Sequence, residues 1–420
     1  MPAISMGGRQ VRNAYDIFVE RGFVEQVTDA DMVRDLLSEP ISCYIGFDPT
    51  AKSLHVGSLL PIMSLAHMQR AGHRPLVIVG AGTALVGDPS GKDEVRPVMT
   101  RKEIDSNAEG IKRQLSQFID FANGKALMLN NADWLAPLNY IDFLRDIGRH
   151  FSVNRMLAAE SYRQRLETGL SFLEFNYMLL QAYDFWYLFK NYNCVLQMGG
   201  NDQWGNILAG ADLTRRLEGE TIHGLTFPLI TTADGSKMGK TARGAIWLDS
   251  ELTSPYEYYQ YWVNVADSDV RRFLAYFTFL PVREIEHLTL HEGEDLRKAK
   301  DVLAYEATRI CHGEDAADKA RSAARQLFRD EAIQDIGGIP TYAVRSADLQ
   351  KGIEAYILFQ NAGLCKTRSE ARRLISQGGA YVNGKRVPSF ETIVGADDVQ
   401  NSIISLRAGK KNYRIVTIRT

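Results

Sequence analysis

The sequence predicts an α/β protein whose first part is a doubly wound parallel sheet, followed by a helical domain and a small α+β domain. Residues 41–47 and 75–79 are short, mainly apolar runs, which is typical of parallel strands buried on both faces. Each run leads into a polar or glycine-rich loop and then into residues at helical spacing. Because this alternation continues to about residue 230, we expect helices on both faces of one sheet.

Length and composition indicate an ordinary globular protein. A chain of 420 residues suggests two or three domains, and 45% hydrophobic with 24% charged residues is typical of soluble proteins. No apolar run approaches the roughly 18 residues of a membrane helix, and residues 1–12 lack the hydrophobic core of a signal peptide. We therefore expect a cytoplasmic protein without a membrane partner. Cys43, Cys194, Cys311 and Cys365 form no Cys-x-x-Cys pair, which predicts reduced thiols and no metal site.

The stretch from Tyr44 to Gly57 predicts a strand, a tight loop and the entrance of a helix. The strand breaks at Asp48-Pro49-Thr50, and apolar residues after Gly57 fit a helix that ends near Gly72, with His55 at its entrance. A helix N-terminus at the carboxyl end of a strand favours phosphates, so the stretch predicts a nucleotide site. The alternative is a buried strand–helix unit whose histidine bonds only a loop carbonyl.

The loop after residues 75–79 is rich in glycine, which lets backbone approach a ligand closely. Asp88 offers a carboxylate for an amine, and Lys92 and Arg96 offer cations for phosphate. A tight structural turn would explain the glycines, but not the acid and the bases together.

A long aromatic helix is expected over residues 172–192. Tyr177, Gln181 and Asp184 are spaced i, i+4 and i+7, so they share one face of it. An aromatic stripe usually belongs to a core. A buried amide and a buried carboxylate need partners, however, and a polar substrate could supply them.

Two later loops also follow predicted strands. Asp202, after two glycines, fits the binding of ribose hydroxyls, although it could equally cap the helix expected over 204–217. Lys237 and Lys240 lie three apart in a loop of small residues and can place two cations on a leaving group. The alternative for such a pair is ordinary surface charge.

The remainder of the chain divides into a helical domain, a linker and a basic module. We expect the sheet domain over residues 1–250, the helical domain over 251–330, a linker over 331–350 and an α+β domain over 351–420. The last range holds twelve Lys or Arg and five Asp or Glu, a charge of +7, whereas the rest of the chain carries −9. This imbalance predicts that the basic module binds a polyanion, unless it is simply a solvated face.

These motifs together resemble class I aminoacyl-tRNA synthetases, specifically the tyrosine enzymes, over about residues 40–300. Gly46–Thr50 with Leu54–Gly57 is similar to their first signature, except that Ser58 replaces the usual second histidine. The octet 199–206 and the Lys-x-Gly-Lys-Thr of 237–241 are similar to two further motifs of these enzymes. The segment 143–156 resembles their helical insertion, which commonly forms the dimer contact, and the basic module resembles the alpha-L RNA-binding module of ribosomal proteins.

The resemblance implies a role for each candidate site residue. Those implied to bind tyrosine are Tyr44, Thr83, Asp88, Tyr177, Gln181, Asp184 and Gln203, with Tyr44 and Asp184 at the phenolic hydroxyl. Those implied in catalysis are Thr50, His55, Lys92, Arg96, Lys237, Lys240 and Thr241. Those implied to bind ATP are Gly46, Asp48, His55, Gly57, Ser58, Gly200, Asp202 and Lys240. Those implied to bind tRNA are Lys366, Arg368, Arg372, Arg373, Lys385, Lys410 and Lys411.

The implied reaction has two steps and needs ATP with Mg²⁺ but no tightly bound metal. Tyrosine is activated by ATP to tyrosyl-adenylate with release of pyrophosphate, and is then transferred to the 3′ end of tRNA by a homodimeric enzyme. Two alternatives stay open: a tryptophan enzyme of the same fold, and a non-catalytic RNA-binding or splicing protein built on it.

Overall fold

The computed structural model describes residues 12–89, 99–233, 235, 238–241, 244–291, 293–328, 339–400, 402–409 and 412–419. The chain forms two compact units. The first is Met1–Asp249 together with Ala266–Leu296, and the second is Ser250–Val265 together with Arg297–Thr420. The residues expected to form one helical domain, 251–330, are therefore divided between the two units.

The first unit is built on a six-stranded sheet. Its strands are β1 (Gln26–Val27), β2 (Ser42–Phe47), β3 (Arg74–Val79), β4 (Leu127–Asn130), β5 (Cys194–Gly200) and β6 (His223–Phe227). Their order is β1-β6-β5-β2-β3-β4, and every neighbouring pair is parallel except β1 with β6. The strand order reverses between β2 and β5, and open parallel sheets bind ligands at such a reversal, outside the carboxyl ends of the strands. The predicted doubly wound fold is thus confirmed.

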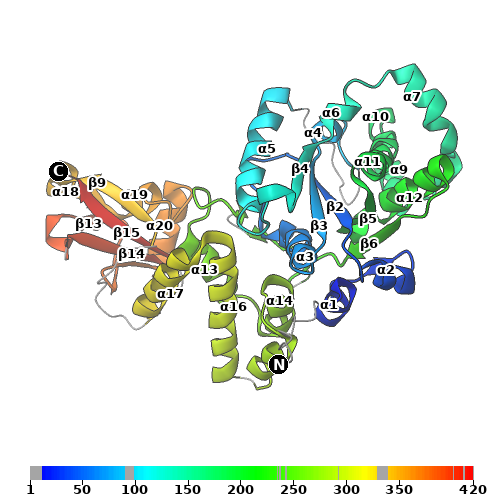
Figure 1. The fold of residues 1–420 in the computed structure, drawn as a ribbon. Helices are drawn as coiled ribbons and strands as arrows, with labels where there is room; N and C mark the ends of the chain where they lie inside the picture. The colour runs from blue at the N-terminus through cyan, green and yellow to red at the C-terminus, as the bar shows by residue number, and fades with distance from the viewer. Residues whose placement is uncertain are drawn as a thin grey trace, which may run out of the picture. The chain divides into compact units, whose positions relative to one another are not determined.

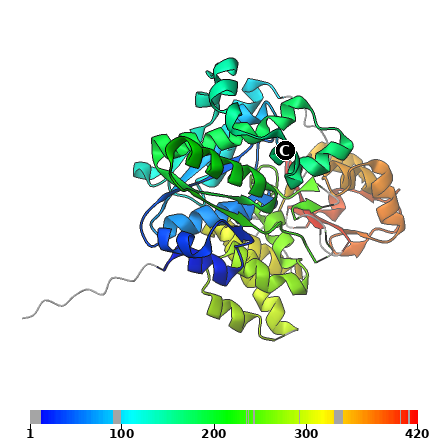
Figure 2. The same ribbon diagram turned by 90° about the vertical axis from the view of Figure 1, so that its right-hand side faces the viewer.

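Helices cover both faces of this sheet (Figures 1 and 2). The helices of this unit are α1 (Ala14–Arg21), α2 (Ala30–Leu36), α3 (Leu59–Arg70), α4 (Ala81–Ala84), α5 (Arg101–Leu115), α6 (Ala132–Leu135), α7 (Tyr140–Asp146), α8 (Val153–Leu157), α9 (Glu160–Thr168), α10 (Phe172–Phe175), α11 (Tyr177–Tyr192), α12 (Trp204–Glu218), α14 (Val270–Phe277) and α15 (Val282–Leu288). The predicted helix after Gly57 corresponds to α3, which is buried along most of its length between the sheet on one side and α1 and α14 on the other. None of the described helices is long and apolar enough to cross a membrane.

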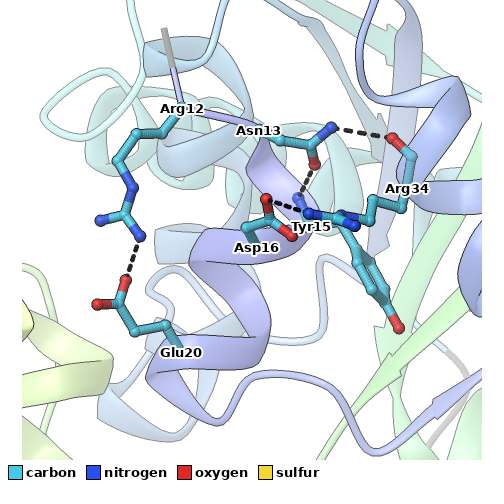
Figure 3. Close-up of polar contacts among 6 residues, drawn as sticks. All are labelled: Arg12, Asn13, Tyr15, Asp16, Glu20 and Arg34. Atoms are coloured by element: carbon cyan, nitrogen blue, oxygen red, sulfur yellow. Dashed lines mark hydrogen bonds and ion pairs between the residues drawn. The ribbon is translucent and has the colours of Figure 1, made fainter. Parts of the chain in front are cut away.

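Polar contacts fasten the N-terminal helices to each other (Figure 3). Asn13 caps α1 by accepting a hydrogen bond from the Tyr15 N–H, and its side-chain amide donates to the Arg34 carbonyl at 2.9 Å. The Arg34 guanidinium makes a two-pronged ion pair with Asp16, at 2.8 and 3.2 Å, while Arg12 pairs with Glu20. These bonds join α1 to α2, so the short helices have partners at the edge of the unit.

Residues 266–296 belong to the first unit, and Arg21 binds their backbone. Its guanidinium donates to the carbonyls of Ala275 and Thr278, at 2.7 and 2.9 Å, and also to that of Leu280. Tyr276 adds a hydrogen bond from its hydroxyl to the Gly22 carbonyl. A buried guanidinium needs several acceptors, and here the end of α14 and the residues just after it provide all three.

The second unit combines long helices with a five-stranded sheet. Its helices are α13 (Pro255–Val263), α16 (Glu294–His312), α17 (Glu314–Phe328), α18 (Ser346–Lys351), α19 (Ala355–Asn361) and α20 (Arg368–Ser376). Its strands are β9 (Thr341–Arg345), β10 (Ile353–Glu354), β11 (Ala380–Val382), β12 (Lys385–Arg386), β13 (Ile393–Val394), β14 (Ile403–Ala408) and β15 (Asn412–Arg419), and the sheet runs β12-β11-β14-β15-β9. The expected hairpin is present: Asn383 and Gly384, with φ of 48° and 76°, connect β11 to β12.

The segment expected to be a linker, 331–350, differs from that expectation in its second half. Residues 341–345 form β9, which pairs in parallel with β15 from Thr341 to Arg345, and α18 follows directly. The reason is that β15 has a free edge, which β9 covers, although β9 itself is mostly half-buried or exposed.

Candidate active site

A cavity of about 640 Å³ opens where the strand order of the first unit reverses. All the residues expected to bind tyrosine line it, as do Thr50 of the catalytic set and every residue expected to bind ATP except Lys240: Tyr44, Gly46, Asp48, Thr50, His55, Gly57, Ser58, Thr83, Asp88, Tyr177, Gln181, Asp184, Gly200, Asp202 and Gln203. These residues come from four separate stretches of chain: three lie at or just after the carboxyl ends of β2, β3 and β5, and the fourth is the first half of α11.

Several expected residues cannot be placed. Lys92, Arg96 and Lys237 lie outside the described residues, as do Lys410 and Lys411 of the tRNA set. For Lys240 and Thr241 only the backbone is described, and it forms β7 (Lys240–Thr241) in an antiparallel pair with β8 (Gly244–Ala245).

Asp184 lies at the closed end of the cavity and is only 4% exposed. Trp134 donates from Nε1 to Oδ1 at 2.7 Å, and Asn131 donates from Nδ2 to Oδ2 at 3.0 Å. Burial raises the pKa of Asp184 to about 7, while these two hydrogen bonds act in the opposite direction. The closed end therefore holds a carboxylate poised to gain or lose a proton near neutral pH.

Asn131 connects this carboxylate to the loop after β3. Its Oδ1 accepts from the Gly82 N–H at 2.7 Å, and its Nδ2 is also 3.0 Å from Thr83 Oγ1. Asn131 is 1% exposed, so its orientation is determined by these partners. The side-chain amide of Asn131 thus links Thr83 of α4 to Asp184 of α11.

Two polar atoms at the closed end have no hydrogen-bond partner among the described residues. They are the Tyr44 hydroxyl and Gln197 Oε1, on side chains that are 2% exposed each. The two residues are directly paired across β2 and β5. A buried polar atom without a partner costs about 1–3 kcal/mol, so a ligand that supplies the partner gains that free energy on binding.

A second polar network lies at the N-terminal end of α12. Gln203 donates from Nε2 to Asp88 at 2.8 Å and lies 3.3 Å from Asp202 Oδ2. Asn206 donates from Nδ2 to both Gln181 and Gln203, each at 3.1 Å. The carboxylates of Asp88 and Asp202 and the amides of Gln181 and Gln203 line the cavity, and these hydrogen bonds orient the two amides.

The other end of the cavity is formed by the start of α3. His55 accepts from the Gly57 N–H at 3.0 Å through Nδ1, and its ring lies edge-on to Trp247 with 6.1 Å between ring centroids. A Cβ at Gly57 would lie 2.6 Å from the His55 ring, so only glycine allows this close approach. Ser58 occupies the N-cap position of α3 and its side chain makes no capping hydrogen bond there.

Gly80, which directly follows β3, permits a similar close approach. A Cβ at this position would lie 2.6 Å from Asp48 Oδ1 and from Thr83 Oγ1. At this one glycine of the loop after β3, the absence of a side chain therefore lets the Asp48 carboxylate and the Thr83 hydroxyl lie against the backbone.

Sequence reasoning did not identify Asn131, Trp134, Gln197, Asn206 or Trp247 as site residues. For Asn131 a signal existed, because it follows a predicted strand as Asp48 does, and the carboxyl end of a strand is where ligand-binding residues gather. Trp134 carried no such signal, since its role depends on α6 lying beside α11.

The described residues expected to bind tRNA are exposed in the second unit. Lys366, Arg368, Arg372, Arg373 and Lys385 are all exposed side chains. Thr367 caps α20 by accepting from the Glu370 N–H at 3.1 Å, which begins the helix that carries the three arginines.

The fold and the cavity define the class of protein. A family model described as tRNA synthetases class I (W and Y) matches residues 37–329, and one described as a tyrosine–tRNA ligase SYY-like C-terminal domain matches residues 331–416. The chain is therefore a class I aminoacyl-tRNA synthetase. Within that class it belongs to the bacterial-type tyrosine–tRNA ligase family.

Relatives of similar length support this assignment. The tyrosine–tRNA ligase of Syntrophus aciditrophicus is 56% identical over 425 residues, covering 97% of this chain and 99% of the relative. That of Desulfosudis oleivorans is 58% identical over 426 residues, covering 96% and 98%. A C-terminally truncated mitochondrial tyrosyl-tRNA synthetase of Aspergillus nidulans has a similar structure, with a TM-score of 0.68 and 32% identity over 76% of this chain and 94% of that one.

These findings confirm the expected enzyme, a ligase that activates tyrosine with ATP and joins it to tRNA. They do not support the two alternatives, the tryptophan enzyme and the non-catalytic RNA-binding protein.

Proposed function

We propose that the cavity binds tyrosine with its phenol at the closed end and ATP toward the start of α3. The observation that carries this orientation is the buried pair of Asp184 and the unpartnered Tyr44 hydroxyl. A phenolic hydroxyl can donate to the Asp184 carboxylate and accept from the Tyr44 hydroxyl at once. Such a ligand accepts from the Tyr44 O–H, whereas an indole or a benzene ring has no acceptor for that donor.

The network around Gln203 suits the other end of the amino acid. Asp88, Tyr177 and Gln181 would hold the ammonium group, with Thr83 beside them, while the Gln203 amide would lie next to the carboxylate. The observation behind this assignment is that Gln203 bridges Asp88 and, through Asn206, Gln181. Asp202, beside Gln203, would then accept from the ribose hydroxyls of ATP.

The first step needs positioning and charge neutralisation more than proton transfer. The tyrosine carboxylate is already ionised, so it attacks the α-phosphate without a general base, and pyrophosphate leaves with the broken bond's electron pair. Thr50 and His55 would contact the phosphates from the start of α3, and Gly46, Gly57 and Gly200 would allow the nucleotide close to the backbone. By the family resemblance, Lys92, Arg96, Lys237, Lys240 and Thr241 would neutralise the leaving phosphates.

Mg²⁺ would accompany ATP and balance phosphate charge. The two lining acids assigned here to ATP, Asp48 and Asp202, would supply carboxylate oxygens, and oxygen donors of this kind fit a hard cation. Because Mg²⁺ keeps most of its waters and binds mainly to substrate phosphates, no dedicated protein cage is required. In the second step a terminal ribose hydroxyl of tRNA attacks the activated carbonyl and releases AMP.

We also propose a homodimer formed by the insertion between β4 and α11. Large apolar side chains on it are exposed, among them Tyr140 (57%), Ile141 (67%), Val153 (56%) and Phe172 (71%). Several such side chains on one segment indicate a protein interface rather than chance exposure. The expected interface, 143–156, lies inside this insertion.

The basic side chains of the second unit would bind tRNA, which places the reaction where tRNA is charged, in the cytoplasm. The experiment that tests the whole proposal is tyrosine-dependent exchange of pyrophosphate into ATP, with tryptophan and phenylalanine in parallel. We expect exchange with tyrosine alone. Equal exchange with tryptophan would contradict the assignment of the closed end to a phenol.

A further inference from the structure

Four side chains of alternating type lie in line across four strands of the second unit. Strand register pairs Arg386 with Tyr381, Tyr381 with Arg407, and Arg407 with Tyr413. Directly paired residues point to the same face of an antiparallel sheet, so these four form one row, here called the Arg–Tyr row. We propose that the Arg–Tyr row binds an unpaired base of tRNA by stacking, an inference that rests on the proposed tRNA-binding role of this unit.

The row is held together by contacts between cations and rings. The Arg407 guanidinium lies 3.9 Å from the centre of the Tyr381 ring and 5.9 Å from that of Tyr413. Arg386 lies so close over Gly378 that a Cβ there would be 1.9 Å from its guanidinium. The Arg407 guanidinium and the Tyr381 ring are therefore already stacked before any ligand arrives, which lowers the entropy cost of binding.

The row lies on the face of the sheet opposite the one that packs on α19 and α20, which Figure 1 shows beside β14 and β15. Leu406 and Ala408, which alternate with Arg407 on β14, are buried in the core beneath those helices. On the side of the row, Ile415 and part of Tyr413 pack against α13 and α17, but Tyr381 and Arg407 are only half-buried and Arg386 is exposed. One end of the row is thus anchored and the other end is open to solvent.

The positive charges of the two arginines of the row are not neutralised by any acidic side chain among the described residues. Within the described part of the chain, neither Arg386 nor Arg407 has an ion pair or a hydrogen bond from its side chain. Arg372 makes a contrasting stack: it lies 4.1 Å from the Tyr356 ring, and Tyr356 is 7% exposed, so that stack is closed beneath by the core.

An unpaired nucleotide matches this surface better than a protein segment does. Aromatic rings and arginine planes stack on every base, and an arginine at the edge can also contact the phosphate that follows. The +7 charge of residues 351–420 attracts a polyanion to the same module. The row would therefore add base contacts to the phosphate contacts expected of α20.

The test measures tRNA affinity of the full-length chain as a function of salt. Base stacking is worth about 1–3 kcal/mol per base, so Tyr381→Leu should weaken binding roughly 5- to 150-fold, while Tyr381→Phe should bind like the unchanged protein. Because a tyrosine carries no charge, Tyr381→Leu should leave the slope of log affinity against log salt unchanged. Arg386→Gln should lower that slope by about one.

Two controls separate a failure of the row from a failure of the unit. Pyrophosphate exchange and thermal denaturation should be unchanged in Tyr381→Leu, and the triple change Arg368→Gln, Arg372→Gln and Arg373→Gln should weaken tRNA binding. If the triple variant weakens binding and Tyr381→Leu does not, the row is not a base site and α20 still binds tRNA. Equal loss in Tyr381→Phe and Tyr381→Leu would also overturn stacking. If no variant changes tRNA binding, the proposed role of the whole unit is wrong.

Discussion

Trp134 donates a hydrogen bond of 2.7 Å to Asp184 from a ring that is itself stacked on Tyr187, with 4.5 Å between ring centroids. The indole is therefore a rigid donor, and it holds one carboxylate oxygen while Asn131 holds the other. Asp184 can still accept from a ligand because each carboxylate oxygen has more than one acceptor site. The geometry of the closed end thus depends on residues fifty positions earlier in the chain.

The first prediction concerns pH. Burial raises the pKa of Asp184 to about 7. Tyrosine binding without ATP should therefore tighten as pH rises from about 6 to 8, because the ionised carboxylate is the stronger acceptor for the phenol. Equilibrium dialysis of tyrosine over this range is the measurement. Asp184→Asn should bind more weakly with no midpoint near pH 7, and an identical pH profile in that variant would contradict the assignment.

Folding stability should show the opposite trend. Because the folded-state pKa of Asp184 lies above the unfolded value of about 3.9, the folded protein holds this proton more tightly. The resulting stabilisation is complete below about pH 4 and is lost as pH rises through about 7. The melting temperature of the unchanged protein, relative to that of Asp184→Asn, should therefore be highest at low pH and should fall as pH rises toward 8.

The second prediction isolates the Trp134 hydrogen bond. Trp134→Phe keeps an aromatic ring against Tyr187 but removes the N–H donor. A hydrogen bond to a charged group contributes about 1.5–3 kcal/mol, so the ionised form of Asp184 should become less stable and the binding midpoint should move above 7. Asn131→Ala should act in the same direction. A lower melting temperature with an unmoved midpoint would mean that Trp134 supports the fold only.

The third prediction concerns tyrosine against phenylalanine. A site built to bond a hydroxyl rejects the analogue that lacks it, because its polar groups stay unpaired; tyrosine-specific synthetases are the worked example of this rule. Tyr44→Phe and Asp184→Asn should each lower the ratio of kcat/KM for tyrosine to that for phenylalanine, with the larger loss for Asp184. Unchanged ratios in both variants would show that the hydroxyl is held elsewhere.

Tyr44→Phe carries its own internal control. The Tyr44 hydroxyl is buried without a partner in the described structure, so removing it should not lower the melting temperature. Loss of tyrosine selectivity together with unchanged or higher stability would therefore be a direct signature of a hydroxyl kept for the substrate.

The parts of the site that lie next to each other in sequence could be predicted from the sequence. The run from Tyr44 to Gly57 carries its strand, its turn and its helix start locally, and Tyr177 to Asp184 share a face because a helix repeats every 3.6 residues. Asn131 and Trp134 could not be assigned in this way. Their contact with Asp184 requires that β4 lie beside β3 and that α6 pack near α11, which no local pattern states.

The same distinction explains the differences in domain organisation. Residues 266–296 look helical in isolation, but Arg21 binds their carbonyl groups, so they belong to the first unit. β9 is short and half-exposed, with little apolar signal, and it becomes a strand because β15 offers an edge. In both cases a partner more than seventy residues away decides the structure.

The fourth prediction concerns the lysines expected at the leaving group. We expect Lys237 and Lys240 to stabilise mainly the negative charge that develops on the leaving pyrophosphate in the transition state. Removing either ammonium group should then lower kcat for pyrophosphate exchange about 100-fold or more, with little change in the KM for tyrosine. Lys237→Ala and Lys240→Ala in steady-state exchange are the measurement. Lys125→Ala is a matched control, because Lys125 is exposed and paired with Asp120 at 2.7 Å. An effect confined to KM would contradict the proposed role.

The fifth prediction tests the division of labour between the two units. A chain ending after Phe328 keeps every residue that lines the cavity, so it should still form tyrosyl-adenylate and exchange pyrophosphate at close to the full rate. It should be less stable, because Tyr256 and Ala323 pack against Ile415, and Glu257 pairs with Arg414 at 2.9 Å.

That shortened chain should fail to charge tRNA, because it lacks the basic side chains of residues 351–420. Those side chains release counterions when they meet phosphates, so the tRNA affinity of the full chain should fall steeply with salt while exchange changes much less. Replacing Arg368, Arg372 and Arg373 together by Gln should reproduce the charging defect without the loss of stability. If the shortened chain charges tRNA normally, the basic module is not the tRNA-binding part. If exchange is lost in the triple variant as well, the two units do not act separately, because none of these arginines lines the cavity.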